Sequence, residues 1–187
     1  MTAPDSKKMP NLCDRDSPFH YVTALNLLSK LGVDVNRVYQ QLYETMPLPK
    51  LLLLERALSH LKVSLGGALV VAWLGDDDFV YAGADEGHAE GIIDILRQIQ
   101  GVRAAALLKE RVRDGRVETK VSLRSTDGAV NVAAIAQKKD GGGHVQAAGF
   151  TSAGGVPAIS EWIEAQIADQ IGSPRPDTGG DREASGA

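Results

Sequence analysis

Cysteine is almost absent from the sequence, and so is any long apolar run. The one cysteine, Cys13, has no partner for an internal disulfide, so a reducing compartment is expected. No apolar stretch approaches the length of a bilayer span, and residues 1–20 lack the apolar middle of a secretory signal. These absences predict a cytoplasmic protein that makes no contact with a membrane.

The sequence also lacks a surplus of positive charge. Its formal net charge is −4, which argues against a protein that coats nucleic acid through bulk basic charge. Any contact with a polyanion must therefore be local. Residues 103–124 offer one candidate region, because they contain seven basic and three acidic side chains.

The 187 residues are enough for one substantial core with a small helical appendage. We expect disordered tails at 1–19 and 172–187, because both segments have little to bury. Residues 20–65 predict a helical linker segment, and residues 66–171 predict the main domain. Helical and strand patterns alternate along the chain, which favours an α/β fold: a mixed β-sheet with packed helices, preceded by the short helical segment.

Hydrophobic periodicity and capping residues predict the elements in the first half of the chain. One helix is expected to start at Asp34 and to end before Pro47, and another to run over 48–66. The apolar run 67–74 predicts a buried strand. Residues 85–101 predict one amphipathic helix, whose inward face would carry Ile92, Ile95, Leu96 and Ile99.

The second half predicts three further elements. A short helix is expected to start near Asp127 or Asn131 and to have Lys138 and Lys139 in its last turn. A short strand is expected at 147–152. A closing helix over 156–171 would turn Ile159, Ile163 and Ile167 inward.

Asp114 and Gly115 form a two-residue turn signal that predicts a β-hairpin and fixes the register of its arms. On one face Lys109 would lie opposite Lys120, Arg111 opposite Glu118, and Arg113 opposite Arg116. On the other, Ala106 would face Leu123, Leu108 would face Val121, and Val112 would face Val117. Two opposed lysines destabilise a sheet unless an anion or a carboxylate lies between them. The basic face is thus equally consistent with a solvated surface and with an anion-binding one.

The segment KKDGGGHVQAAGF (138–150) is the most unusual stretch of the chain. Gly141, Gly142 and Gly143 could bring successive N–H groups together around an anion and let a ligand approach the main chain closely. His144 would add a ring donor for a phosphate oxygen. Taken alone, a glycine triplet is more often a flexible loop beside an exposed histidine.

Three motifs together resemble a known family: KVSLRS (120–125), VAAIA (132–136) and GGGHVQAAGF (141–150). They are similar to the C-terminal, DHH-associated domain of the DHH phosphoesterases. The nearest subgroup is that of the bifunctional oligoribonucleases and phosphoadenosine-phosphate phosphatases, the nanoRNases. Residues 85–105 resemble this subgroup's helix and following strand, and residues 27–47 resemble its interdomain linker.

The resemblance implies that residues 66–171 bind short single-stranded RNA or DNA, or a nucleotide, and contain no catalytic residue. Gly141, Gly142, Gly143 and His144 would hold the substrate phosphate. Arg124, with Ser122 nearby, would hold a neighbouring phosphate or the terminal nucleotide. A guanidinium suits this role because its fork of donors matches phosphate oxygens.

The resemblance also implies that hydrolysis belongs to a separate N-terminal DHH domain, which holds two manganese ions in this family. The chain contains no Asp-His-His string, so no metal site or cofactor is expected in it. The acidic clusters Asp14, Asp16, His20 and Asp76, Asp77, Asp78 are expected to be solvated loops.

One further departure is Asp140, which stands where the family usually has another glycine and places a negative charge beside the glycine string. Two alternatives to a simple binding module stay open. The chain could be the C-terminal half of a split enzyme whose DHH domain is a separate partner chain, or a vestigial regulatory module that binds a protein.

Overall fold

The computed structural model describes residues 30, 32, 34–43, 45–126, 128 and 130–172. The chain divides into two compact units, residues 1–46 and residues 47–187. In the first unit, helix α2 (Val35–Tyr43) begins after Asp34, whose carboxylate accepts a hydrogen bond from the Arg37 N–H at 3.0 Å. This confirms the predicted cap. The predicted tail over 1–19 lies outside the described residues, as does the predicted C-terminal tail beyond Gly172.

The second unit is built on a six-stranded mixed sheet with the strand order β1-β2-β3-β4-β6-β5. The strands β2 and β3 run parallel, and the other neighbours run antiparallel. This sheet and its helices confirm the predicted α/β class. The strands are β1 (Lys62–Ser64), β2 (Leu69–Leu74), β3 (Ala104–Arg113), β4 (Arg116–Ser125), β5 (Gly142–His144) and β6 (Ala147–Ala153).

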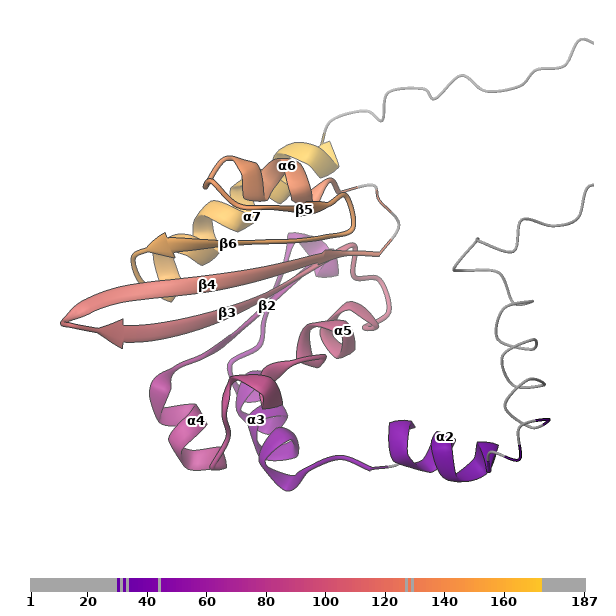
Figure 1. The fold of residues 1–187 in the computed structure, drawn as a ribbon. Coiled ribbons are helices and arrows are strands. Elements are labelled where there is room, and N and C mark those ends of the chain that lie inside the picture. The colour runs from indigo at the N-terminus through magenta and orange to yellow at the C-terminus, as the bar shows by residue number, and fades with distance from the viewer. Residues whose placement is uncertain are drawn as a thin grey trace, which may run out of the picture. The chain divides into compact units, whose positions relative to one another are not determined.

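Helices lie on both faces of this sheet (Figure 1). One face is covered by α6 (Val132–Gln137) and α7 (Val156–Gly172), and the other carries α3 (Leu48–Ser59), α4 (Asp76–Ala82) and α5 (Ile92–Arg97). Alternate residues of β3 therefore enter two separate cores. Leu108 packs in the α6 and α7 core, whereas Leu107 packs in the core under α3, α4 and α5.

The β3–β4 hairpin has the predicted register. Lys109 pairs with Lys120, Arg113 pairs with Arg116, and every other predicted cross-strand pair is also present. The two-residue turn fixes this register because its length allows only one alignment of the arms. Val112 and Val117, near the tip, are 60% and 37% exposed, so the apolar inner face ends before the turn.

The helix predicted over 48–66 is too long. Helix α3 ends at Ser59, and residues 62–64 form β1, which pairs with β2. The chain then makes a short 3-10 turn, η1 (Leu65–Gly67), before β2. The polar residues Lys62 and Ser64 are tolerated in a strand here because β1 lies at the edge of the sheet.

The single helix predicted over 85–101 is also wrong. The segment forms a 3-10 turn, η2 (Glu86–Ala89), and the separate helix α5, which starts after Gly91 at φ 82°. This left-handed glycine changes the helical phase. Ile92 and Leu96 are buried as predicted, but Ile93 replaces Ile95 and Ile99 on the inward face.

The last predicted elements are confirmed with small differences. Asn131 caps α6 by accepting a hydrogen bond from the Ala134 N–H at 3.0 Å, while Asp127 lies outside the described residues. Lys138 follows the helix as its C-cap instead of lying in its last turn. β6 contains the predicted strand, and α7 buries Ile159, Ile163 and Ile167 as predicted.

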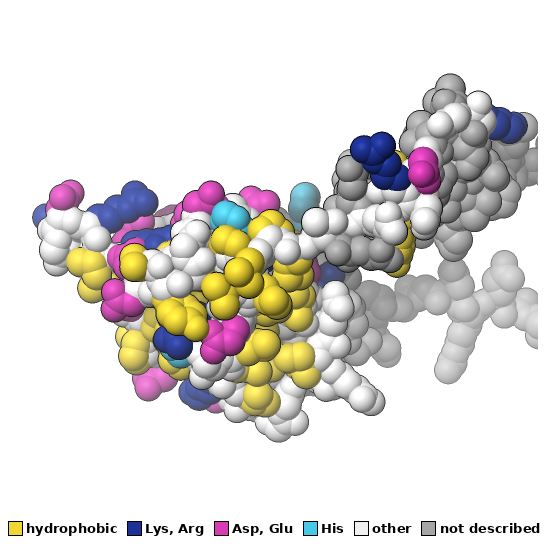
Figure 2. Space-filling model, turned by 90° about the horizontal axis from the view of Figure 1, so that it is seen from below, with side chains coloured by type: hydrophobic (Ala, Val, Ile, Leu, Met, Phe, Trp, Pro, Cys, Tyr) yellow, Lys and Arg dark blue, Asp and Glu magenta, His cyan; other side chains and the backbone are white. Residues whose placement is uncertain are grey.

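The surface of α3 and α4 carries exposed apolar side chains (Figure 2). They are Leu48, Leu51, Leu58, Val80 and Tyr81. Within the described ranges, the structure has no helix long and apolar enough to cross a membrane.

Candidate functional site

The sheet brings the predicted site residues to neighbouring strands. Arg124 of β4 pairs with Ala147 of β6, and Ala147 pairs in turn with His144 of β5. Residues in one such row point to the same face of a sheet. Arg124 and His144 therefore lie on one face, two strands apart, which corresponds to roughly 10 Å between their backbones.

The next row on the same face contains Ser122, Gly149 and Gly142. We call this surface the open face; it carries Lys120, Ser122 and Arg124 of β4, Ala147, Gly149 and Thr151 of β6, and Gly142 and His144 of β5. The helices on this side of the sheet pack mainly over β2 and β3, with α5 reaching β4. Gly142 and His144 are exposed, and Arg124 is half-buried.

Contrary to the expectation of an anion site, the glycine string does not gather its N–H groups around one point. Gly142, Gly143 and His144 form β5 at the edge of the sheet, so their N–H groups alternate in direction and do not converge on one point. A Cβ on Gly141 would lie 2.5 Å from Phe150 Cβ, and one on Gly143 would lie 2.5 Å from Ala148 Cα. The element that approaches these glycines so closely is β6.

Gly142 differs from its two neighbours. A Cβ at this position would have nothing within 4 Å, and its φ is not in the left-handed range. Packing within the described part of the chain therefore does not explain a glycine here. On the open face, Gly142, Gly149 and Ala147 form a floor almost without side chains between Arg124 and His144.

Arg124 is held by its neighbours. Its Nε donates to Asp94 Oδ1 of α5 at 3.3 Å, and its Nη1 donates to the Leu123 carbonyl at 3.1 Å. The side chain is 27% exposed. Beside it lies a hollow of about 380 Å³ between α5 and the sheet, with Asp94, Lys109, Ser122 and Arg124 in its lining. Asp94 could not be identified from the sequence alone, because only the fold brings α5 to β4.

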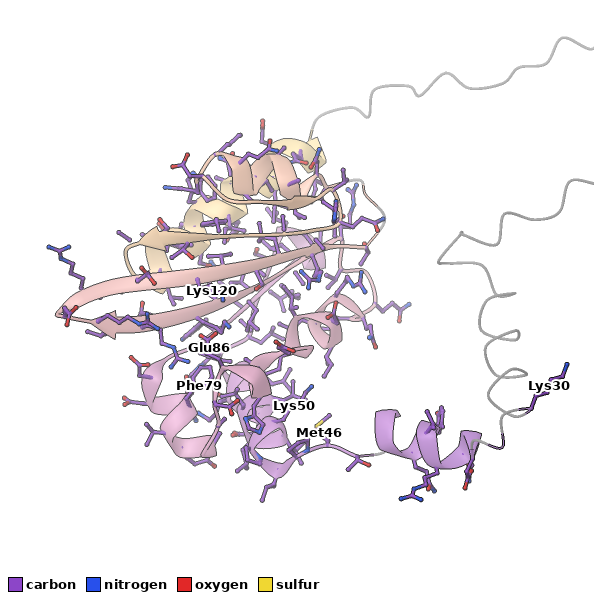
Figure 3. The ribbon with its side chains drawn as sticks, in the orientation of Figure 1. Lys30, Met46, Lys50, Phe79, Glu86 and Lys120 are labelled. Carbon is purple, nitrogen blue, oxygen red and sulfur yellow. The ribbon has the colours of Figure 1, made fainter. Side chains whose placement is uncertain are left out.

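The opposed lysines of the hairpin have the carboxylate that their pairing requires. Lys109 Nζ donates to Glu86 Oε2 at 3.2 Å, and Lys120 Nζ lies 3.8 Å from the same oxygen. Burial by itself would raise the pKa of Glu86, but the hydrogen bond and charge of Lys109, with the nearby Lys120, outweigh burial and lower that pKa. Figure 3 shows Glu86 beneath the hairpin that carries Lys120.

The acidic segment 76–78 is not the solvated loop that the sequence predicts. Asp78 is buried and accepts from Arg56 Nε at 2.7 Å and from the Gly75 N–H at 2.8 Å. The hydrogen bond from the Val112 N–H and the ion pair with Arg111 lower the pKa of Asp76. These carboxylates are already engaged in structural contacts. Among the described residues, no group of three or more His, Cys, Asp or Glu side chains could hold a metal ion, and Asp14, Asp16 and His20 lie outside them.

Comparison with known proteins places this geometry in a family. The DHHA1 domain matches residues 66–169. The bifunctional oligoribonuclease and PAP phosphatase NrnA of Thermus thermophilus is 38% identical over 102 residues, which are 54% of this chain and 28% of that protein. An exopolyphosphatase-related protein of Bacteroides fragilis has a similar structure, with a TM-score of 0.69 and 26% identity over 82% of this chain and 44% of that one. The chain thus corresponds to less than half of either relative's length.

Proposed function

The chain belongs to the DHHA1 domain family, and from that premise we propose that its open face binds the phosphates of short single-stranded RNA or DNA, or of a nucleotide. In this proposal the chain holds the substrate of an oligoribonuclease-like phosphoesterase. Within the string Gly141, Gly142, Gly143 and His144, the two residues on the open face, Gly142 and His144, contact one phosphate. Arg124 with Ser122 contacts a neighbouring phosphate or the terminal nucleotide.

One observation carries the proposal: Arg124 and His144 lie in a single row across β4, β6 and β5, on the open face. A guanidinium offers charged, paired donors to a phosphate, and an imidazole offers one further donor. The floor between them, Ala147 with Gly149 and Gly142 in the next row, would let a ligand lie against the main chain. Asp94 fixes the direction of the Arg124 side chain, which lowers the entropy lost when a ligand binds.

We propose that a DHH domain with its manganese ions carries out hydrolysis, either in the same polypeptide or as a separate partner chain. The Thermus relative is a bifunctional oligoribonuclease and PAP phosphatase, and the matched part covers only 28% of it. Mixing the chain with a separately produced DHH domain should then give manganese-dependent cleavage of a dinucleotide, whereas the chain alone should give none.

Binding is tested by fluorescence anisotropy with a labelled five-nucleotide RNA and the same strand as DNA. Arg124→Ala and His144→Ala should each weaken binding, the first by about tenfold or more, because a hydrogen bond to a charged group contributes about 1.5–3 kcal/mol. Lys62→Ala is the control. Lys62 lies on β1, at the opposite edge of the sheet, and should leave the affinity unchanged.

Gly142→Ala gives the sharpest test of the open face. The added methyl group has free space in the protein, so the variant should fold with unchanged stability. It would nevertheless stand where the proposed ligand meets the main chain, and we expect weaker binding. If Gly142→Ala, Arg124→Ala and His144→Ala all bind like the parent, the ligand does not use this face; if the parent binds no oligonucleotide or nucleotide, the proposed function is wrong.

A further inference from the structure

The hairpin carries a second cluster of basic groups, separate from Arg124. A hollow of about 260 Å³ lies on the same side of the sheet, and Glu86, Lys109, Arg111, Lys120 and Thr151 are part of its lining. Thr151 pairs with Lys120 across β4 and β6, so the hollow continues the open face towards the hairpin turn. Lys109 lines both this hollow and the one beside Arg124.

The charges of this cluster are incompletely balanced. Lys109 and Lys120 share the carboxylate of Glu86, which also lies 3.7 Å from Arg111. Arg111 has a carboxylate of its own, because its guanidinium pairs with Asp76 at 2.6 Å and lies over the Phe79 ring. One acidic group is therefore left for two lysines. The lining also contains Glu118 and Arg113, whose charges offset one another.

Glu86 is not needed to hold its own segment in place. The η2 turn is capped by Asp85, which accepts from the His88 N–H at 3.2 Å, and the Glu86 side chain is 51% exposed. Its carboxylate can therefore move to solvent without breaking the backbone hydrogen bonds of η2. A phosphate in the hollow would meet the same two ammonium groups and would carry more acceptor oxygens.

We propose that this hollow is a second phosphate subsite, and that Glu86 occupies it as an internal competitor while no ligand is bound. Lys109 and Lys120 contact the phosphate, and Thr151 contributes a hydroxyl. This inference rests on the proposed function, since it extends the same open face. Lys120 lies four residues from Arg124 on β4, a separation of roughly 13 Å along the strand. The two subsites therefore select a strand of several nucleotides over a mononucleotide or dinucleotide.

The test compares 5′-phosphorylated oligoadenylates of two and four nucleotides on the full chain. The parent should bind the longer strand more tightly. Lys120→Gln should weaken binding of the longer strand by about fivefold, change binding of the shorter strand by less than about twofold, and reduce the slope of log K against log salt by about 0.7. Glu86→Gln should strengthen binding of the longer strand by about threefold to fivefold, because it removes the competing charge.

Several outcomes separate this inference from the proposed function. If Arg124→Ala weakens both strands but Lys120→Gln and Glu86→Gln change neither, the second subsite does not exist and the first one stands. Equal losses for both strands on Lys120→Gln would likewise overturn the length selection. Failure of the parent to bind any strand would overturn the proposed function.

A second measurement tests the hollow without nucleic acid, so it remains informative if the parent binds no strand. Inorganic pyrophosphate should shift the amide resonance of Thr151 in the parent and should shift it less in Lys120→Gln. If pyrophosphate leaves the Thr151 resonance unchanged in the parent and in Glu86→Gln, the hollow is not an anion site. Thermal unfolding of both variants checks that the fold is retained.

Discussion

The two halves of the sheet differ in how they are covered. On β2 and β3, helices pack against both faces, and alternate residues enter two cores. On β4, β6 and β5, helices α6 and α7 close one face, while the opposite face is only partly covered. The covering changes between the neighbouring strands β3 and β4. Leu107 and Ala105 of β3 are buried, whereas their partners on β4, Ser122 and Arg124, are partly exposed.

This difference shows which part of the sheet helices leave open. In the covered half, the residue types are set by packing on both sides. In the half-covered one, successive residues of β4 alternate between buried Leu123 or Val121 and polar Ser122 or Lys120. These polar residues of β4 begin where the covering by α3, α4 and α5 becomes incomplete. The glycines of β5 and β6 extend this polar series with a surface that has almost no side chains.

Substitution of adjacent residues on β4 should separate the two faces most strongly. Leu123 is fully buried, so Leu123→Ala should lower the free energy of unfolding by about 2–5 kcal/mol. Ser122 faces the open side, and Ser122→Ala should lower it by less than about 0.5 kcal/mol. Chemical denaturation with both variants measures the contrast. Equal losses would show that the open face is packed as tightly as the other one.

The glycine string provides a smaller contrast within one strand. Gly143 has φ 142°, and an added Cβ would lie 2.5 Å from Ala148 Cα, so Gly143→Ala should cost about 2 kcal/mol or more of stability. Gly142→Ala should be nearly neutral, since its Cβ would meet nothing within 4 Å. Hydrogen exchange of the β6 amides would report whether the β5–β6 pairing is lost. A stable Gly143→Ala variant would contradict the close approach of these strands.

Local signals predicted much of this fold. The Asp114-Gly115 turn fixed the hairpin register, and the isoleucine spacing of α7 fixed its buried face, because both depend on residues close in sequence. The strand at the glycine string was harder to predict. It forms because the chain turns at 145–146 and β6 then pairs with it, which brings Phe150 and Ala148 against the glycines. Likewise, the like-charge pair of Lys109 and Lys120 indicated that an anion or a carboxylate could lie between them, but only the fold identifies a carboxylate there as Glu86.

The position of Gly91 shows the other limit of sequence reasoning. The apolar spacing of 85–101 fits one helix, and a glycine within a helical pattern is often tolerated. Here the left-handed φ of 82° ends one turn and starts α5, which carries Asp94 to Arg124. The motifs made Arg124 and His144 candidates. Their common row became visible only when β6 was placed between their strands.

Asp140 and Asp114 give the smallest and most specific contrast. Both have the left-handed backbone that favours glycine, at φ 56° and 51°. Asp140→Gly and Asp114→Gly should therefore each raise the free energy of unfolding by about 0.5–1 kcal/mol, since aspartate pays a steric penalty there. Asp140 directly precedes Gly141 and β5, whereas Asp114 lies at the hairpin tip. Only Asp140→Gly should also strengthen oligonucleotide binding, because it removes a negative charge beside the proposed phosphate contact.

Asp140→Asn separates the effect on stability from the effect on oligonucleotide binding at position 140. Asparagine tolerates the left-handed conformation, so this variant should match the parent in stability while it binds as tightly as Asp140→Gly. Denaturant unfolding and anisotropy on the same three proteins give both quantities. If Asp114→Gly raises affinity as much as Asp140→Gly does, the gain comes from general charge or stability, and a phosphate contact beside Gly141 is excluded. If Asp140→Asn leaves affinity at the parent's value, the carboxylate at 140 does not face the ligand.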